Sequence, residues 1–280
     1  MNRSIKITCL SFSFAFASLA SSAQFGGLGK GKINSRSIDA VTKGAKALNF
    51  TNADAIKLSK EGVAWMDANN PVAAATDPYA IRLEKIFGKH KNEDGLSLNY
   101  KVYKVKDINA FACADGSVRV FSSLMDILTD EEILAVVGHE IGHVKNEDTK
   151  DAIKAAYMRA AVSDAASSQS GAVRQLSDDE LGVFTENLLG AKHSRRQESE
   201  ADTYAYDFLK KHHYNVVAAF SAFKKLSLLS AGNEQTRSEK MMSSHPDSEA
   251  RAAEVKKRAE KDGGWKDPGT ITLPKTKLTA

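Results

Sequence analysis

The sequence predicts a mostly helical α+β fold, with a small antiparallel sheet beside a helix bundle. Apolar residues recur at helical spacing through most of the segment from 52 to 261. Only two stretches, 96–102 and 117–121, have the apolar composition and alternation of strands, and both adjoin turns that contain Gly95 or Gly116. The 280 residues are 42% hydrophobic and 26% charged, which is typical of a globular protein.

The helical pattern divides into segments separated by turn and capping residues. Asp77 followed by Pro78 is typical of a helix start, because proline is favoured in the first turn. Ser122 and Ser123 are expected to cap a short helix that leads to Thr129. We expect further helices at 37–49, 52–69, 77–90, 131–148 with a helical continuation over 146–162, 178–191, 195–212, 216–230, and from Pro246 to about 261.

The segment 131–148 carries the pattern His-Glu-Ile-Gly-His from His139 to His143. Thr129 and Glu132 have the spacing of a capping box, which predicts where this helix begins. Two histidines four residues apart lie on the same face of a helix and can bind one metal ion. Zinc bound there keeps a position for water, and Glu140 is placed to accept that water's proton.

The third protein ligand is expected downstream, in Glu-Ser-Glu-Ala-Asp at 198–202. Glu198 and Asp202 are four residues apart, so on a helix they share one face. Glu198 would complete a His₂Glu zinc site, and Asp202 would accept the outer N–H of a zinc-binding histidine. The alternative is that these acids only solvate a helix face.

These motifs resemble the HtpX/BepA/LoiP-type family of zinc metallopeptidases. The likeness covers roughly 95 to 260 and includes Asn-Ala-Phe-Ala, Arg-Val-Phe-Ser-Ser-Leu-Met-Asp, the His-Glu-x-x-His pattern and Arg-Gln-Glu-Ser-Glu-Ala-Asp. Several motifs in one order are more specific than one short pattern alone. The resemblance implies a zincin-like fold, one Zn²⁺ per chain held by His139, His143 and Glu198, and Glu140 as the catalytic base.

The resemblance also covers a His-Pro-x-x-x-x-Arg element at His245, Pro246 and Arg251. It implies that His245 lies near the metal, with Arg251 in the surroundings of the ligands. His245 would then donate a hydrogen bond to the oxyanion of the reaction, or occupy the water's position and hold the enzyme latent. A structural role at the start of the last helix is the third reading.

The strand just before the metal-binding helix is a candidate for substrate binding. If it formed a sheet edge, an extended peptide would pair with its backbone. A fully paired interior strand is the equally weighted alternative. The residues concerned are Ser117, Val118, Arg119, Val120 and Phe121.

The N-terminus has the pattern of a cleaved secretory signal over residues 1–23, with Arg3 and Lys6 before an apolar stretch and a small-x-small site before Gln24. A lipoprotein signal would end in a cysteine, but Cys9 lies near its start. We expect a lead-in with N-terminal helices at 24–75, the metallopeptidase domain at 76–262 and an irregular tail at 263–280.

Taken together, the sequence predicts a zinc endopeptidase of the bacterial periplasm. The family implies misfolded or unassembled envelope proteins as substrates, outer-membrane assembly components as further partners, and peripheral association with the outer membrane as one option. A zinc-bound chaperone or assembly factor with weak or latent protease activity, and a cell-wall peptide amidase, remain alternatives. Nucleic acid is not expected as a partner, because the net charge is only +4 and no basic face is clustered.

Overall fold

The computed structural model describes residues 50–161, 173–231 and 235–274, which all belong to one compact unit, Val41–Ala280. The predicted signal segment and the predicted helix at 37–49 lie outside the described residues. None of the described helices is long and apolar enough to cross a membrane.

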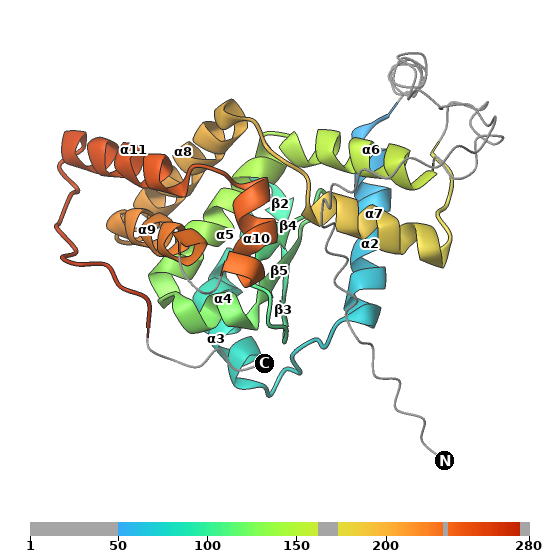
Figure 1. Ribbon diagram of the computed structural model, residues 1–280, viewed down its shortest axis with the longest axis horizontal. Helices are drawn as coiled ribbons and strands as arrows, with labels where there is room; N and C mark the ends of the chain where they lie inside the picture. The colour runs from blue at the N-terminus through green and yellow to red at the C-terminus, as the bar shows by residue number, and fades with distance from the viewer. Residues whose placement is uncertain (1–49, 162–172, 232–234, 275–280) are drawn as a thin grey trace, which may run out of the picture. The chain divides into compact units, whose positions relative to one another are not determined.

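Helices dominate the fold, as predicted (Figure 1). They are α2 (Asn52–Asn69), α3 (Pro78–Phe87), the 3₁₀ turn η1 (Gly88–His90), α4 (Ser122–Ile127), α5 (Asp130–Lys145), α6 (Asp148–Ala161), α7 (Asp178–Leu189), α8 (Arg195–Lys211), α9 (Val217–Ala231), α10 (Gln235–Ser244) and α11 (Ser248–Lys261). The predicted helix over 131–148 is divided, because Glu147 adopts a positive φ of 62° between α5 and α6. Helix α10 was not predicted. The last helix begins at Ser248, two residues after Pro246.

The main sheet is mixed, although the sequence predicted an antiparallel one. Its strands are β3 (Asn99–Tyr103), β4 (Ala110–Ala112) and β5 (Ser117–Phe121), in the order β3-β5-β4. Strand β5 pairs in parallel with β3 and antiparallel with β4. The short strand β4 was not predicted. It lies between β3 and β5 along the chain and runs in the opposite direction to both, so that β3 and β5 can pair in parallel. The antiparallel hairpin of β1 (Asn92–Glu93) and β2 (Leu96–Ser97) is separate.

The hypothesis that Ser117–Phe121 is a sheet edge is wrong. Strand β5 is the central strand, with β3 on one side and β4 on the other, so both sides of its backbone are already paired. Arg119 is only 2% exposed and forms two hydrogen bonds with Asp67 of α2, of 2.8 and 2.9 Å. The residues predicted to bind substrate, Ser117, Val118, Arg119, Val120 and Phe121, therefore belong to the core.

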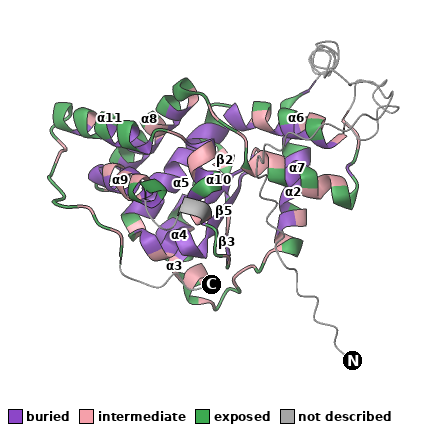
Figure 2. Cartoon of the chain, viewed as in Figure 1, coloured by how far each residue is buried: buried purple, intermediate pink, exposed green. Residues whose placement is uncertain are grey.

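Helix α5 lies at the centre of the fold and is buried from Glu132 to Val144 (Figure 2). It is capped as predicted, with Thr129 accepting from Glu132 N–H. Helix α8 packs closely along α5 where both carry small residues. A Cβ atom added to Gly142 would lie 3.0 Å from Ala201 Cα. Glycine on one helix and alanine on the other thus bring the two backbones together.

The remaining helices surround this pair. Helices α9 and α11 pack on each other, and α9 also contacts α5. Helices α2, α6 and α7 pack together around a second apolar core that includes Leu58, Ile153 and Phe184. The site described next lies where α5, α8 and the segment between α10 and α11 meet.

Candidate metal centre

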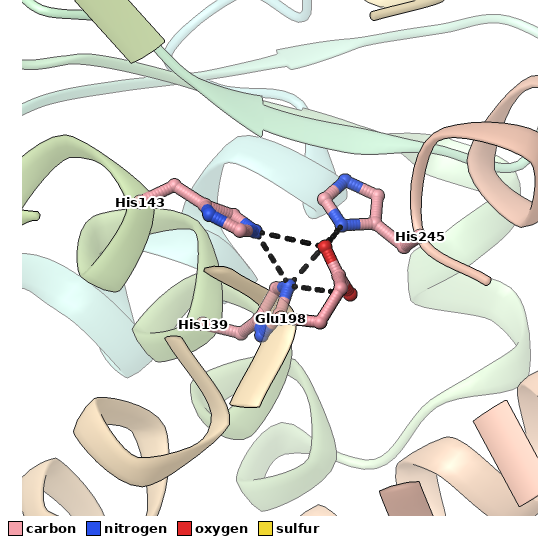
Figure 3. A group of neighbouring side chains, drawn as sticks. All are labelled: His139, His143, Glu198 and His245. Atoms are coloured by element: carbon pink, nitrogen blue, oxygen red, sulfur yellow. Dashed lines mark hydrogen bonds and ion pairs between the residues drawn. The ribbon is translucent and has the colours of Figure 1, made fainter. Parts of the chain in front are cut away.

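His139 and His143 project from the same face of α5, as their spacing predicted (Figure 3). Their Nε2 atoms are 3.0 Å apart, and both side chains are almost fully buried. Glu198 reaches them from the first turn of α8, with Oε1 3.2 Å from His143 Nε2. Two helices that are far apart in sequence therefore contribute the three predicted ligands to one point.

His245 joins this group from the segment between α10 and α11. Its Nδ1 atom lies 3.0 Å from Glu198 Oε1 and 3.2 Å from His139 Nε2. The backbone N–H of His245 donates to Met241 O, so the residue continues the last turn of α10. The four side chains together offer three nitrogen atoms and one oxygen atom to a common centre.

The donor atoms have the separations that a tetrahedral zinc ion requires. Zinc bonds of 2.0–2.1 Å place neighbouring ligand atoms about 3.3 Å apart, and the distances given above are 3.0–3.2 Å. We assign the proton of each α5 histidine to Nδ1, because a carboxylate accepts there. Two Nε2 lone pairs then face each other, an arrangement that a cation between them stabilises. The donor set fits zinc.

Each α5 histidine has its own carboxylate behind it. Asp202 Oδ1 lies 2.8 Å from His139 Nδ1, as the sequence predicted. Asp148, at the start of α6, lies 2.9 Å from His143 Nδ1 and was not predicted. Such acceptors fix the tautomer and orientation of a metal-binding imidazole.

Arg251 of α11 joins the carboxylates of Glu198 and Asp202. Its Nε and Nη2 atoms donate to the two oxygens of Asp202 at 2.9 and 2.6 Å, and Nη1 lies 2.9 Å from Glu198 Oε2. The guanidinium also stacks over Phe223, 4.1 Å from the ring centroid. Arg251 therefore lies directly beside the predicted ligands and orients the carboxylate of Glu198.

Glu140 lies on α5 between the two histidines and is buried. Its Oε1 atom has no hydrogen-bond partner among the described residues, and lies 3.6 Å from His245 Nε2. Burial raises the pKa of Glu140 above its usual value. A buried carboxylate oxygen left unpaired is costly to a fold, and it indicates a position kept for a water or a substrate.

The electrostatics of the ligands suit metal binding. Burial, with the positive charge of Arg251 nearby, lowers the pKa of His139 well below its usual value, which keeps the imidazole neutral. Burial alone would raise the pKa of Glu198, but hydrogen bonds with His143 and His245 hold it well below its usual range. Burial opposes the charged form of His143, but hydrogen bonds with Glu198 and Asp148 raise its pKa above the usual value. The site thus offers a neutral imidazole at His139 and an ionised carboxylate at Glu198, which are forms that bind zinc.

His193 is a fourth histidine of the site, to which the sequence gave no role. Its ring stacks on His143, with 3.8 Å between ring centroids and 15° between planes. Burial lowers the pKa of His193 to about 3, with further lowering by the charges of His143 and His245. It lies in the segment before α8, outside any helical pattern, so only its place directly before the Glu198 motif could have indicated it.

A small cavity lies between these side chains and strand β4. Ala110, Ala112, Glu140, His143 and His245 are among its lining residues, and its volume is about 40 Å³. This volume holds a few water molecules and no peptide, since ligand sites are typically about 300–1,000 Å³.

Comparison with known proteins gives a family match and two characterised relatives. The sequence profile of peptidase family M48 matches residues 83–259. Metalloprotease YcaL of Escherichia coli (strain K12) is 41% identical over 214 residues, which are 76% of this chain and 83% of the relative. Metalloprotease LoiP of the same organism is 39% identical over 219 residues, 78% of this chain and 85% of the relative.

Proposed function

Because the chain belongs to peptidase family M48 and is a metalloprotease, we propose that it is a zinc-dependent endopeptidase acting on misfolded or unassembled proteins of the bacterial cell envelope. The observation that carries the proposal is the convergence of His139, His143 and Glu198 on one point, with Glu140 beside them. Two imidazoles and one carboxylate form a ligand set that leaves a position for water.

Zinc held by these three residues would supply a Lewis acid that polarises a peptide carbonyl and lowers the pKa of a water molecule. Glu140 accepts the proton of that water and passes it to the leaving amine, so that one carboxylate acts as base and then as acid. Its raised pKa suits this exchange, because the best proton shuttle has a pKa nearer to neutral than that of a free carboxylate. Asp202 and Asp148 hold the two histidines in their binding tautomers.

Strand β4 replaces β5 as the proposed substrate-binding strand. It has one neighbouring strand within the described part of the chain, and it lines the cavity beside Glu140. Cys113 N–H donates to Ser117 O and Phe121 N–H donates to Asn109 O, so the alternating residues Ala110 and Ala112 turn their backbone groups away from β5. Of these groups, the N–H of Ala110 donates to Asn109 Oδ1. An extended peptide pairing there would be recognised through its backbone, which favours unfolded chains with loose sequence preference.

His245 is proposed to keep the enzyme latent. Its Nδ1 atom lies among the donor atoms of the other three residues, in the position that the attacking water would otherwise occupy. The small size of the cavity agrees with a closed resting form. Opening would require the segment between α10 and α11 to move His245 away from Glu198.

The envelope location rests on the sequence of residues 1–23, which has the pattern of a cleaved secretory signal. Export would bring the enzyme into the periplasm, where unassembled envelope proteins and outer-membrane assembly components are found. N-terminal sequencing of the protein from separate periplasmic and cytoplasmic extracts tests this part. A chain that begins at Gln24 supports export, and an uncleaved chain in the cytoplasm contradicts it.

The proposed activity is tested with one envelope protein offered in its folded and unfolded forms. Zinc-loaded enzyme should cleave the unfolded form, a chelator should stop cleavage, and added zinc should restore it. The same assay follows aggregation of the unfolded protein. This distinguishes a protease from a zinc-bound chaperone, the alternative that the latent arrangement suggests. Suppressed aggregation without cleavage, even after His245→Ala, would assign a chaperone function and overturn the protease.

A further inference from the structure

A second group of metal-binding side chains lies away from the centre described above. It consists of His90 at the end of η1, Glu93 in β1 and His212 at the C-terminal cap of α8. The three residues come from two parts of the chain more than a hundred residues apart. They meet where the β1–β2 hairpin lies against the end of α8.

The donor atoms of this group converge on one carboxylate oxygen. Glu93 Oε2 lies 3.0 Å from His212 Nε2 and 3.5 Å from His90 Nδ1. All three donor atoms lie within 4.8 Å of one another. Two of the three separations are close to the value of about 3.3 Å expected between neighbouring ligands of tetrahedral zinc.

His90 is buried with one ring nitrogen unpaired. Its side chain is 1% exposed, and Nδ1 has no hydrogen-bond partner among the described residues. Nε2 lies 2.9 Å from the hydroxyl of Tyr214. With the ring proton assigned to Nε2, this hydroxyl accepts it and Nδ1 keeps a lone pair directed at Glu93. A metal-binding histidine commonly donates its other N–H in this way.

Aromatic rings pack against the imidazole of His90 and exclude water from it. The rings of Phe87 and Phe208 pack edge-on against His90, with centroids 6.3 and 5.0 Å away. An unpaired nitrogen in such a position destabilises the fold unless something binds it.

The ammonium group of Lys211 only partly neutralises the charge of Glu93. Lys211 Nζ contacts Glu93 Oε1 at 2.5 Å and Asp94 Oδ1 at 2.8 Å, so one ammonium group serves two carboxylates. The other oxygen of Glu93, Oε2, remains directed at the two imidazoles. The side chain of His212 is 25% exposed, which gives an ion and a water ligand access from solvent.

We propose that His90, Glu93 and His212 bind a second zinc ion, which has a structural role. Two imidazoles and one carboxylate suit a borderline divalent cation, with water as the fourth ligand. The ion would fasten η1 and β1 to the end of α8. Because the first turn of α8 carries Glu198, this fastening steadies the helix that completes the catalytic centre.

The test compares two neighbouring histidines in full-length Glu140→Gln protein, chosen to prevent self-digestion. His212→Asn removes a proposed ligand. His213→Asn is the matched control, since His213 is exposed and asparagine tolerates its positive φ of 60°. Each protein is dialysed against micromolar free zinc, and bound zinc is measured by mass spectrometry together with the melting temperature.

The His213→Asn control should hold one zinc ion per chain more than the His212→Asn protein. Added zinc should also raise the melting temperature of the control by more than it raises that of His212→Asn. His90→Gln should lose the same ion, which separates a buried site from zinc bound at the surface. Equal zinc content in the His212→Asn protein and the control would overturn the proposal, whatever number the catalytic centre holds. Loss with His212→Asn but not with His90→Gln would overturn the buried site.

Discussion

His245 Nδ1 lies 3.0 Å from Glu198 Oε1, the same carboxylate oxygen that is 3.2 Å from His143 Nε2. A group that donates a hydrogen bond to the oxyanion must leave room for the substrate oxygen between itself and the metal. It should therefore lie farther from the other ligand atoms than a metal ligand does. His245 instead lies among them. The sequence left its role open between oxyanion donor, latch and structural residue, and this relationship favours the latch.

Replacing His245 with alanine should therefore raise protease activity. The competent state of a closed enzyme is typically populated at about 10% or less, so removing the latch should raise activity about tenfold or more. The measurement is the initial rate of cleavage of an unfolded substrate by zinc-loaded protein, with His213→Asn as an exposed histidine control. A fall of about a hundredfold with zinc retained would assign His245 as an oxyanion donor instead. A rate within twofold of the parent across pH 5 to 9 would leave it structural.

The close contact of α5 and α8 should make the two glycines of α5 respond differently to alanine. Replacing glycine in a helix gains about 1 kcal/mol of helix propensity, whereas overpacking costs about 1–3 kcal/mol. At Gly142 the new Cβ would meet the backbone of Ala201 at 3.0 Å, whereas at Gly138 it would meet the ring of Phe208 at 3.3 Å and Ala205 Cα at 3.4 Å.

Gly142→Ala should consequently lower the free energy of unfolding by about 1–2 kcal/mol and weaken zinc binding by displacing Glu198. Gly138→Ala should be close to neutral in both measurements. Urea unfolding and zinc titration of the two proteins make the comparison. Equal behaviour would mean that α8 adjusts freely, and that the close approach does not set the position of Glu198.

Asp67 should make stability depend on acidity, because its partner Arg119 is buried in the central strand. Burial would raise the pKa of Asp67, but hydrogen bonds from Arg119, Lys101 and Tyr103 lower it to about 2. A carboxylate whose folded pKa is depressed stabilises the fold above its unfolded pKa of about 3.9. That stabilisation is lost as the pH falls toward 2.

Asp67→Asn should lower the free energy of unfolding at pH 7 by about 3 kcal/mol, because the charge of Arg119 is left buried and unpaired. The difference in free energy of unfolding between the parent and Asp67→Asn should shrink by about 2 kcal/mol as the pH falls from 5 to 2. Asp207→Asn, which breaks an ion pair with Arg258 at the surface, should cost less than about 1 kcal/mol. A gap that stays constant with pH would contradict the assigned pKa shift.

Sequence reasoning located the site where spacing within one element was enough. His139 and His143, and likewise Glu198 and Asp202, are four residues apart on helices with clear caps.

The features that were missed depend on contacts between segments. Strand β4 has three residues, too few for a periodic signal, and without it β5 could not be identified as the central strand. Asp148 reaches His143 only because Glu147 turns the chain with a positive φ between two helices. Nothing local in the sequence indicates that His193 stacks on His143 or that α10 ends directly before His245.

The role of Glu140 is tested most directly by Glu140→Gln, measured for zinc content and for cleavage of an unfolded protein in the same preparation. Glutamine keeps the volume of the side chain and leaves His139, His143 and Glu198 in place, so zinc content and melting temperature should match those of the parent. Without a group to accept the proton of water, cleavage should fall by a factor of about 10² or more. Cleavage at the parent's rate by zinc-loaded Glu140→Gln protein would contradict the account.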